Sequence, residues 1–262
     1  TLALTRPRFD AEPLERIRSQ IFSSLRQEAE DPNTIAGKTL FKTLFPAHPY
    51  GRPVDGTLES VAAITQTDLK GFVKRRLAKD NLAIGVVGDI TAEALKTVLD
   101  KTFGGLPAKA WAWAIPEAVL KGQGRTVVVT KPAPQSAIVF ADKGPKRQDP
   151  DFYAAYVMNH VLGGGGFTSR LYNTVREKRG LAYSVYSALH PLDRAGLIFG
   201  AAGTANANVA ETLSLLRREW KRMADEGMSE QELADAKTYL TGSYPLRFTS
   251  SGSIAAMLVG IQ

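Results

Sequence analysis

Four consecutive glycines, Gly163 to Gly166, constrain the fold of this chain more than any other feature. An apolar segment at about 150–162 precedes them, and the segment after them ends in a basic turn and a further glycine, Gly180. A run rich in β-forming residues follows directly over 181–190. The pattern predicts a helix, a glycine turn, a second helix and then a strand.

The predicted return of the chain brings Tyr183, on the strand, back towards Arg176, in the last turn of the second helix. A cation and a phenol in this arrangement can hold a peptide carbonyl or stabilise a developing oxyanion. A structural explanation also exists, since cations complement a helix C-terminus, Gly180 is a natural cap and a tyrosine on a strand can belong to the core. Periodicity by itself favours the structural explanation.

Composition and periodicity together predict an α+β protein. The chain has 262 residues, of which 44% are hydrophobic and 23% charged, as in ordinary globular proteins, and this length suits two domains. Periodicity fades between about 104 and 125, which indicates a linker. The predicted helices cover 10–30, 34–44, 65–77, 91–103, 150–162, 206–225 and 229–243, and the predicted strands 81–89, 126–130, 136–141, 181–190 and 195–203.

Bulk properties exclude several classes of protein. No apolar run approaches the length of a membrane span, and the absence of cysteine excludes disulfides and thiolate metal sites. The net charge of +7 comes from scattered residues with small clusters at 74–76, 217–218 and 221–222. Because no aromatic RNA-binding motif accompanies them, we interpret the charge as a solvated surface and expect no nucleic-acid partner.

Most common catalytic motifs are missing. The three histidines, His48, His160 and His190, are isolated and belong to no H-x-x-E-H or H-E-x-x-H sequence, so we expect no metal ligands in this chain. No G-x-S-x-G elbow occurs. The glycine run lacks the Gly-Lys-Ser/Thr of a phosphate-binding loop and follows a helix, so nucleotide binding is the weakest of the alternatives.

The glycine turn and its flanks resemble a known motif. The matching residues are Leu162-Gly-Gly-Gly, Ser169-Arg-Leu, Val175-Arg-Glu-Lys and Gly180-Leu-Ala-Tyr-Ser-Val. They resemble the second-module motif of the pitrilysin, insulysin and mitochondrial-processing-peptidase family of zinc metallopeptidases (peptidase family M16), in its small bacterial form. His48-Pro-Tyr-Gly-Arg-Pro and 77–89 are similar to segments of the family's first module, so the resemblance covers almost the whole chain.

The resemblance implies two related α/β modules, each a mostly antiparallel sheet covered by helices. Residues 1–104 would be the C-terminal part of the first module, 105–124 the linker and 125–262 the second module, with both modules truncated. Arg176 and Tyr183 would hold the substrate and stabilise the tetrahedral intermediate. Further substrate contacts are implied for Gly163, Gly164, Gly165, Ser169 and Arg170.

The resemblance also bears on the metal. The family's H-x-x-E-H helix would lie before Thr1, and the position of the remaining zinc ligand falls near Ser24, with Ser23 beside it. Zinc-binding members have an acid there, and a serine hydroxyl is a poor replacement for a carboxylate on zinc. We therefore expect no cofactor in this chain and place zinc on a partner or in the missing module.

The predicted function is that of a zinc-free subunit that binds peptide and supplies Arg176 and Tyr183 to a zinc-bearing homologous subunit. The expected partners are thus a peptide substrate and that subunit, in the periplasm or outside the cell rather than in the cytoplasm. Two alternatives remain on the same scaffold. One is a self-sufficient zinc protease whose metal helix is absent from this sequence, and the other is a structural core-type assembly subunit.

Overall fold

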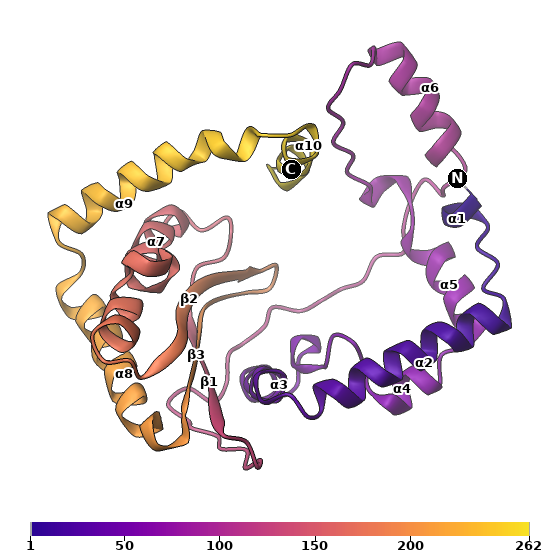
Figure 1. The fold of residues 1–262 in the computed structure, drawn as a ribbon. Coiled ribbons are helices and arrows are strands. Elements are labelled where there is room, and N and C mark those ends of the chain that lie inside the picture. The colour runs from indigo at the N-terminus through magenta and orange to yellow at the C-terminus, as the bar shows by residue number, and fades with distance from the viewer. Residues whose placement is uncertain (1, 262) are drawn as a thin grey trace. The chain divides into compact units, whose positions relative to one another are not determined.

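The structure, a computed structural model, describes residues 2–261 (Figure 1). The chain forms two compact units, each built from separate stretches of sequence. The first consists of the residues up to Leu25, Gly56–Ala114 and the residues from Thr241 onward, and the second of Arg26–Asp55 and Ile115–Leu240. After Ala114 the chain passes from the first unit to the second, and this point lies within the predicted linker 105–124. The assignment of 1–104 and 125–262 to two related modules stays a prediction.

Among the described residues of the first unit, the regular secondary structure is helical. Its helices are α1 (Leu2–Thr5), most of α2 (Ala11–Glu28), α4 (Leu58–Ala62), α5 (Gln66–Arg76), α6 (Ala92–Phe103) and α10 (Ser251–Ile261). Thr65 and Thr91, the first residues of the predicted helices 65–77 and 91–103, cap α5 and α6, each accepting a hydrogen bond from the backbone N–H three residues on. Local sequence therefore sets these helix starts.

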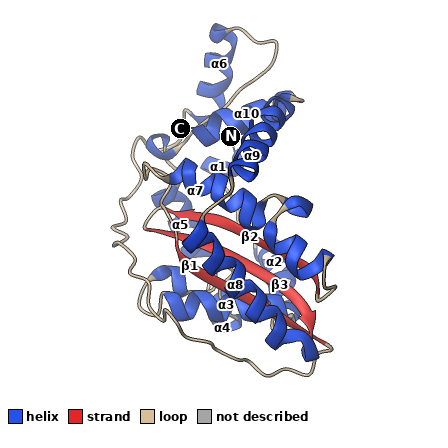
Figure 2. Cartoon of the chain, turned by 90° about the vertical axis from the view of Figure 1, so that its left-hand side faces the viewer, coloured by secondary structure: helices blue, strands red, loops and turns tan. Residues whose placement is uncertain are grey.

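The second unit contains a three-stranded antiparallel sheet, which confirms the α+β class. The strands β1 (Gln135–Lys143), β2 (Ala182–Leu192) and β3 (Ala195–Ala205) lie in the order β1–β3–β2. Helix α3 (Pro32–Leu44) lies on one side of the sheet, and α7 (Phe152–Asn159) and α8 (Val209–Glu226) lie on the other (Figures 1 and 2). Helix α9 (Glu230–Ser243) follows α8.

The central strand β3 supplies residues to a core on each face of the sheet. Ile198 packs with Leu215 and Leu216 of α8, whereas its neighbour Leu197 packs with Phe45 beyond the end of α3. Successive strand residues point to opposite faces, so one strand serves both helical layers. The sheet is consequently fixed from both sides.

Two predicted strands are wrong. Residues 82–89 and 126–130 are irregular, Asn81 ends the 3-10 turn η2 (Lys79–Asn81), and no described strand runs beside either segment. A strand needs a hydrogen-bonded neighbour, which an apolar β-branched run cannot supply by itself. The predicted start of α3 at Thr34 is also wrong. Asp31 caps the helix, because its side chain accepts hydrogen bonds from the backbone and hydroxyl of Thr34, and the helix begins at Pro32.

Candidate functional site

Two π-helical segments lie in this region, one running into the glycine turn and one following it. In the first, η3 (His160–Gly164), the Gly165 N–H donates to the His160 carbonyl five residues back, at 2.8 Å. In the second, η5 (Tyr172–Glu177), the Lys178 N–H donates to Asn173 O in the same pattern, at 3.0 Å. Such π-helical turns are rare and are frequent at functional sites. Both lie within the motif that the sequence singled out.

Packing explains why glycines occupy this turn. A Cβ on Gly163 would lie 2.4 Å from Ser187 Oγ and 2.6 Å from the Ser187 backbone nitrogen, so Gly163 lets β2 approach η3. A Cβ on Gly164 would meet the Asn159 amide at 2.7 Å, and one on Gly165 the His160 carbonyl at 2.6 Å. Their predicted substrate contacts stay a prediction, and Gly163 itself is buried.

We expect Gly163→Ala to lower the free energy of unfolding by about 1–3 kcal/mol, because it overpacks a contact with backbone that cannot rotate away. Gly242→Ala is the matched control, since it adds a Cβ to helix α9 with no neighbour within 4 Å. It should be neutral or stabilising. Urea unfolding followed by circular dichroism measures both, and equal stabilities for the two variants would contradict the packing argument.

The structure brings Arg176 and Tyr183 together. The Arg176 Cζ lies 5.1 Å from the centre of the Tyr183 ring and 4.9 Å from that of Tyr172, so the guanidinium contacts two aromatic rings. No described acidic side chain forms an ion pair with Arg176. The cation is thus held by aromatic contacts that leave its N–H groups available to an added acceptor.

A β-bulge gives Tyr183 its position. Ala182 pairs with Thr204 and Ser184 with Gly203, so Tyr183 is an extra residue without a partner on β3. A bulge re-aims side chains, and here the Tyr183 side chain is released from the alternation of the strand. The residue is 80% exposed. The Tyr183 side chain is therefore accessible, and its ring contacts the Arg176 guanidinium.

Ser169 and Arg170, for which the resemblance implies substrate contacts, are both buried. Ser169 Oγ donates to the Gly166 carbonyl at 2.8 Å. Arg170 forms a two-point ion pair with Glu232 at the start of α9, through Nε at 2.6 Å and Nη2 at 2.5 Å, and Nη2 also donates to Gly227 O at 3.0 Å. These hydrogen bonds from Arg170 lower the pKa of Glu232 to about 2. The observed contacts anchor the motif helix, and substrate contact by either residue stays a prediction.

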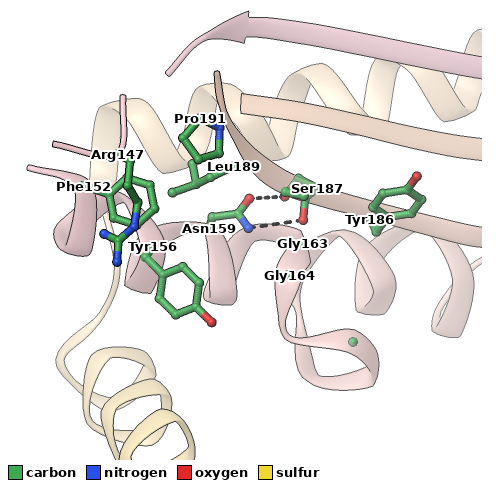
Figure 3. Close-up of a pocket in the computed structure, with 12 residues that line it drawn as sticks. Arg147, Phe152, Tyr156, Asn159, Gly163, Gly164, Tyr186, Ser187, Leu189 and Pro191 are labelled. Carbon is green, nitrogen blue, oxygen red and sulfur yellow. Dashed lines mark hydrogen bonds between the residues drawn. The ribbon is translucent and has the colours of Figure 1, made fainter. Parts of the chain in front are cut away.

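A pocket of about 580 Å³ opens beside the glycine turn (Figure 3). Apolar side chains of α7 and β2 form much of its wall, and the guanidinium of Arg147 stacks on the Phe152 ring at 4.4 Å. The buried pair Asn159 and Ser187 joins the two elements, because Ser187 Oγ donates to Asn159 Oδ1 at 2.7 Å and Asn159 Nδ2 donates to Ser187 O at 3.2 Å. Sequence reasoning missed this pocket, although a polar Asn159 in an apolar helix was a signal.

The described residues do not fit a zinc ion. Within residues 2–261 no three His, Asp, Glu or Cys side chains gather as a metal site would require. Ser23, beside the predicted ligand position, donates to the Ser19 carbonyl of its own helix.

Each histidine also has a structural contact. His48 caps the turn after α3 and contacts the Pro116 carbonyl at 3.0 Å, while the His190 ring meets Phe41 edge-on. His160 stacks on Tyr239, and burial lowers the pKa of His160. The three histidines therefore hold together elements of the second unit.

The sequence model of the peptidase M16 inactive domain matches residues 63–240. The chain belongs to the peptidase M16 inactive-domain family. The family resemblance predicted from the glycine turn is thereby confirmed.

Individual relatives agree with this assignment. A crystal structure described as a peptidase M16 inactive domain from Pseudomonas fluorescens is 31% identical, superposes with a TM-score of 0.90, and is matched over 98% of this chain and 61% of that chain. A Mycobacterium leprae protein described as an uncharacterized zinc protease is 30% identical over 92% of this chain and 54% of its own length. The non-peptidase homolog YmxG of Helicobacter pylori is 31% identical over 93% and 56%. The chain thus spans about half the length of these curated relatives.

No helix among residues 2–261 has the length and apolar character needed to cross a membrane.

Proposed function

We propose that this chain belongs to a zinc-free subunit of a zinc metalloendopeptidase, which binds peptide and supplies Arg176 and Tyr183 to the active site of a zinc-bearing homologous partner. The observation that carries the proposal is the exposed Tyr183 side chain, whose ring contacts an Arg176 that has no described counter-ion. Hydrogen-bond donors held in place before the reaction stabilise a developing oxyanion better than mobile ones. Membership of the inactive-domain family supports the division of roles.

The pocket at the glycine turn would hold part of the peptide. It offers apolar side chains of α7 and β2 and the cation of Arg147, which suits an apolar side chain followed by a carboxylate. The exposed backbone at Gly164 and Gly166 lies at its rim. Because Tyr186 of the pocket wall and Tyr183, which contacts Arg176, both lie on β2, a peptide that leaves this pocket along β2 would continue towards Arg176.

A self-sufficient protease is the second candidate, since the Mycobacterium leprae relative is described as a zinc protease and this chain spans about half of it. The non-peptidase description of the Helicobacter pylori relative favours the zinc-free reading, and the same description suits a purely structural assembly subunit as a third candidate. We place the complex in the periplasm or outside the cell, as the family resemblance implies, and cell fractionation tests this.

The deciding experiment uses the full-length protein, alone and mixed with a homologue from the same organism that carries the H-x-x-E-H motif. Zinc content is measured by mass spectrometry and peptidase activity with a quenched fluorescent peptide library. We expect no bound zinc and no cleavage alone, and cleavage in the mixture. One equivalent of zinc together with cleavage by the protein alone would establish a self-sufficient protease, and an inert mixture with a zinc-loaded partner would leave only the structural role.

A further inference from the structure

A basic aromatic surface in the first unit has no role in the proposed function. One part of it is the segment after α6, with two tryptophans and a lysine, and the other part is the end of α5 and the turn that follows, with three cations. The residues are Arg75, Arg76, Lys79, Lys109, Trp111 and Trp113. The two tryptophans are 67% and 68% exposed. Large exposed aromatic side chains next to unpaired cations are uncommon on a protein surface that stays in water, and they are typical of interfaces.

Specific hydrogen bonds hold the tryptophan segment in place. The Trp111 N–H donates to the Arg75 carbonyl at 2.9 Å, and Arg76 Nη1 donates to the Trp111 carbonyl at 3.1 Å. The last carbonyls of a helix lack partners within it, so the segment satisfies one at the end of α5. Two more contacts extend the attachment, from the Lys79 N–H to Pro107 O and from the Ala110 N–H to Asp80 Oδ1, both 2.9 Å. The rings are therefore positioned before any partner binds.

The arginines stack on the tryptophans. The Arg76 Cζ lies 4.1 Å from the Trp113 ring centre, and the Arg75 Cζ lies 5.8 Å from that of Trp111. Within residues 2–261 no ion pair neutralises the four cations of this surface. Two acids lie near these cations: Asp80 accepts a backbone hydrogen bond, and Asp68 is close enough to Arg75 that hydrogen bonds from Thr65 and, to a lesser extent, the Arg75 charge lower the pKa of Asp68. With four cations against these two acids, the surface combines fixed aromatic rings with net positive charge.

We infer that this basic aromatic surface is a docking site for an acidic segment of a partner protein that carries apolar side chains between its carboxylates. Charge complementarity selects the acidic character, and arginine forms two-point hydrogen bonds with carboxylates. Fixed tryptophan and arginine side chains are the usual anchors of protein interfaces. A lipid surface fits less well, because inserting these rings would also remove the stacked guanidinium groups from water. The inference does not depend on the proposed function.

The first test asks whether the surface is free in the full-length protein. Acrylamide quenching is compared between the full-length protein and Trp111→Phe/Trp113→Phe, so that the difference reports these two side chains. We expect strong quenching of that difference signal. Weak quenching would mean that another part of the same protein covers the rings, and would overturn the inference.

The second test measures binding of a fluorescent peptide that alternates glutamate with leucine and phenylalanine. We expect micromolar affinity that falls with added salt and drops about tenfold or more in Trp111→Ala and in Arg75→Glu/Arg76→Glu. The control Lys96→Glu/Arg217→Glu makes the same change of net charge on exposed residues elsewhere, and should bind normally. The same peptide with lysine in place of glutamate should not bind.

Three outcomes would contradict the inference. Equal loss in the control variant would reduce the effect to net charge. Failure of the acidic peptide alongside binding of phosphatidylglycerol vesicles would assign the surface to lipid, and binding of oligothymidine alone would assign it to nucleic acid. Circular dichroism of each variant shows whether it is folded, and Trp113→Phe, which keeps a ring, should retain most of the affinity.

Discussion

Arg176→Ala is expected to lower turnover by the reconstituted protease about 10²–10³-fold, the usual effect of removing one oxyanion donor. Because the guanidinium lies against Tyr172 and Tyr183 and forms no described ion pair, its loss should leave stability almost unchanged. The matched control is Arg179→Ala, one turn later in the chain, whose side chain is exposed and paired with Glu211 at 2.6 Å. That variant should retain normal turnover.

Tyr183→Phe separates two roles of the tyrosine. It keeps the ring that contacts Arg176 but removes the hydroxyl. If the hydroxyl donates to the oxyanion, kcat falls by a similar factor with little change in KM; if the ring only positions Arg176, turnover stays near normal and Tyr183→Ala alone is impaired. Normal kcat in both Arg176→Ala and Tyr183→Phe would remove the chemical role altogether.

The part of the fold that could be predicted is the part set by neighbouring residues. The caps at Thr65 and Thr91 depend on a side chain and a backbone group three residues apart. Ser229, the first residue of the predicted helix 229–243, likewise forms a capping box with Glu232 at the start of α9. The strand predicted over 81–89 failed for the opposite reason, since a strand requires a neighbour that its own sequence does not contain.

The motif itself was recognisable in sequence, but its geometry was not. The wide turn η3 depends on the approach of Ser187 to Gly163, and the bulge that frees Tyr183 depends on its pairing with β3. The position of Arg170 in the motif predicts a substrate ligand, whereas its observed partner, Glu232, lies 62 residues away in the sequence. Contacts between residues so far apart in the sequence follow from tertiary packing and leave no local sequence pattern.

Breaking the ion pair between Arg170 and Glu232 is expected to cause a large loss of folding stability. Arg170 is 9% exposed, and removing one partner of a buried pair leaves an uncompensated charge, which costs about 3–5 kcal/mol when both groups are fully buried. Since about a third of the Glu232 side chain is exposed, we expect Glu232→Gln to lower the free energy of unfolding by about 2–3 kcal/mol. Glu211→Gln, in the exposed pair with Arg179, should cost less than about 1 kcal/mol.

The pH dependence identifies the cause. The pKa of Glu232 falls from 4.5 to about 2 on folding, so its contribution is fully present above pH 4.5 and is lost as the pH falls towards 2. The stability difference between the wild type and Glu232→Gln should therefore be constant near neutral pH and shrink in acid. Urea unfolding at a series of pH values measures it. A difference that persists unchanged down to pH 2 would show that Glu232→Gln acts through packing at the start of α9, and Arg170→Met/Glu232→Gln should then cost the sum of the two single variants instead of less.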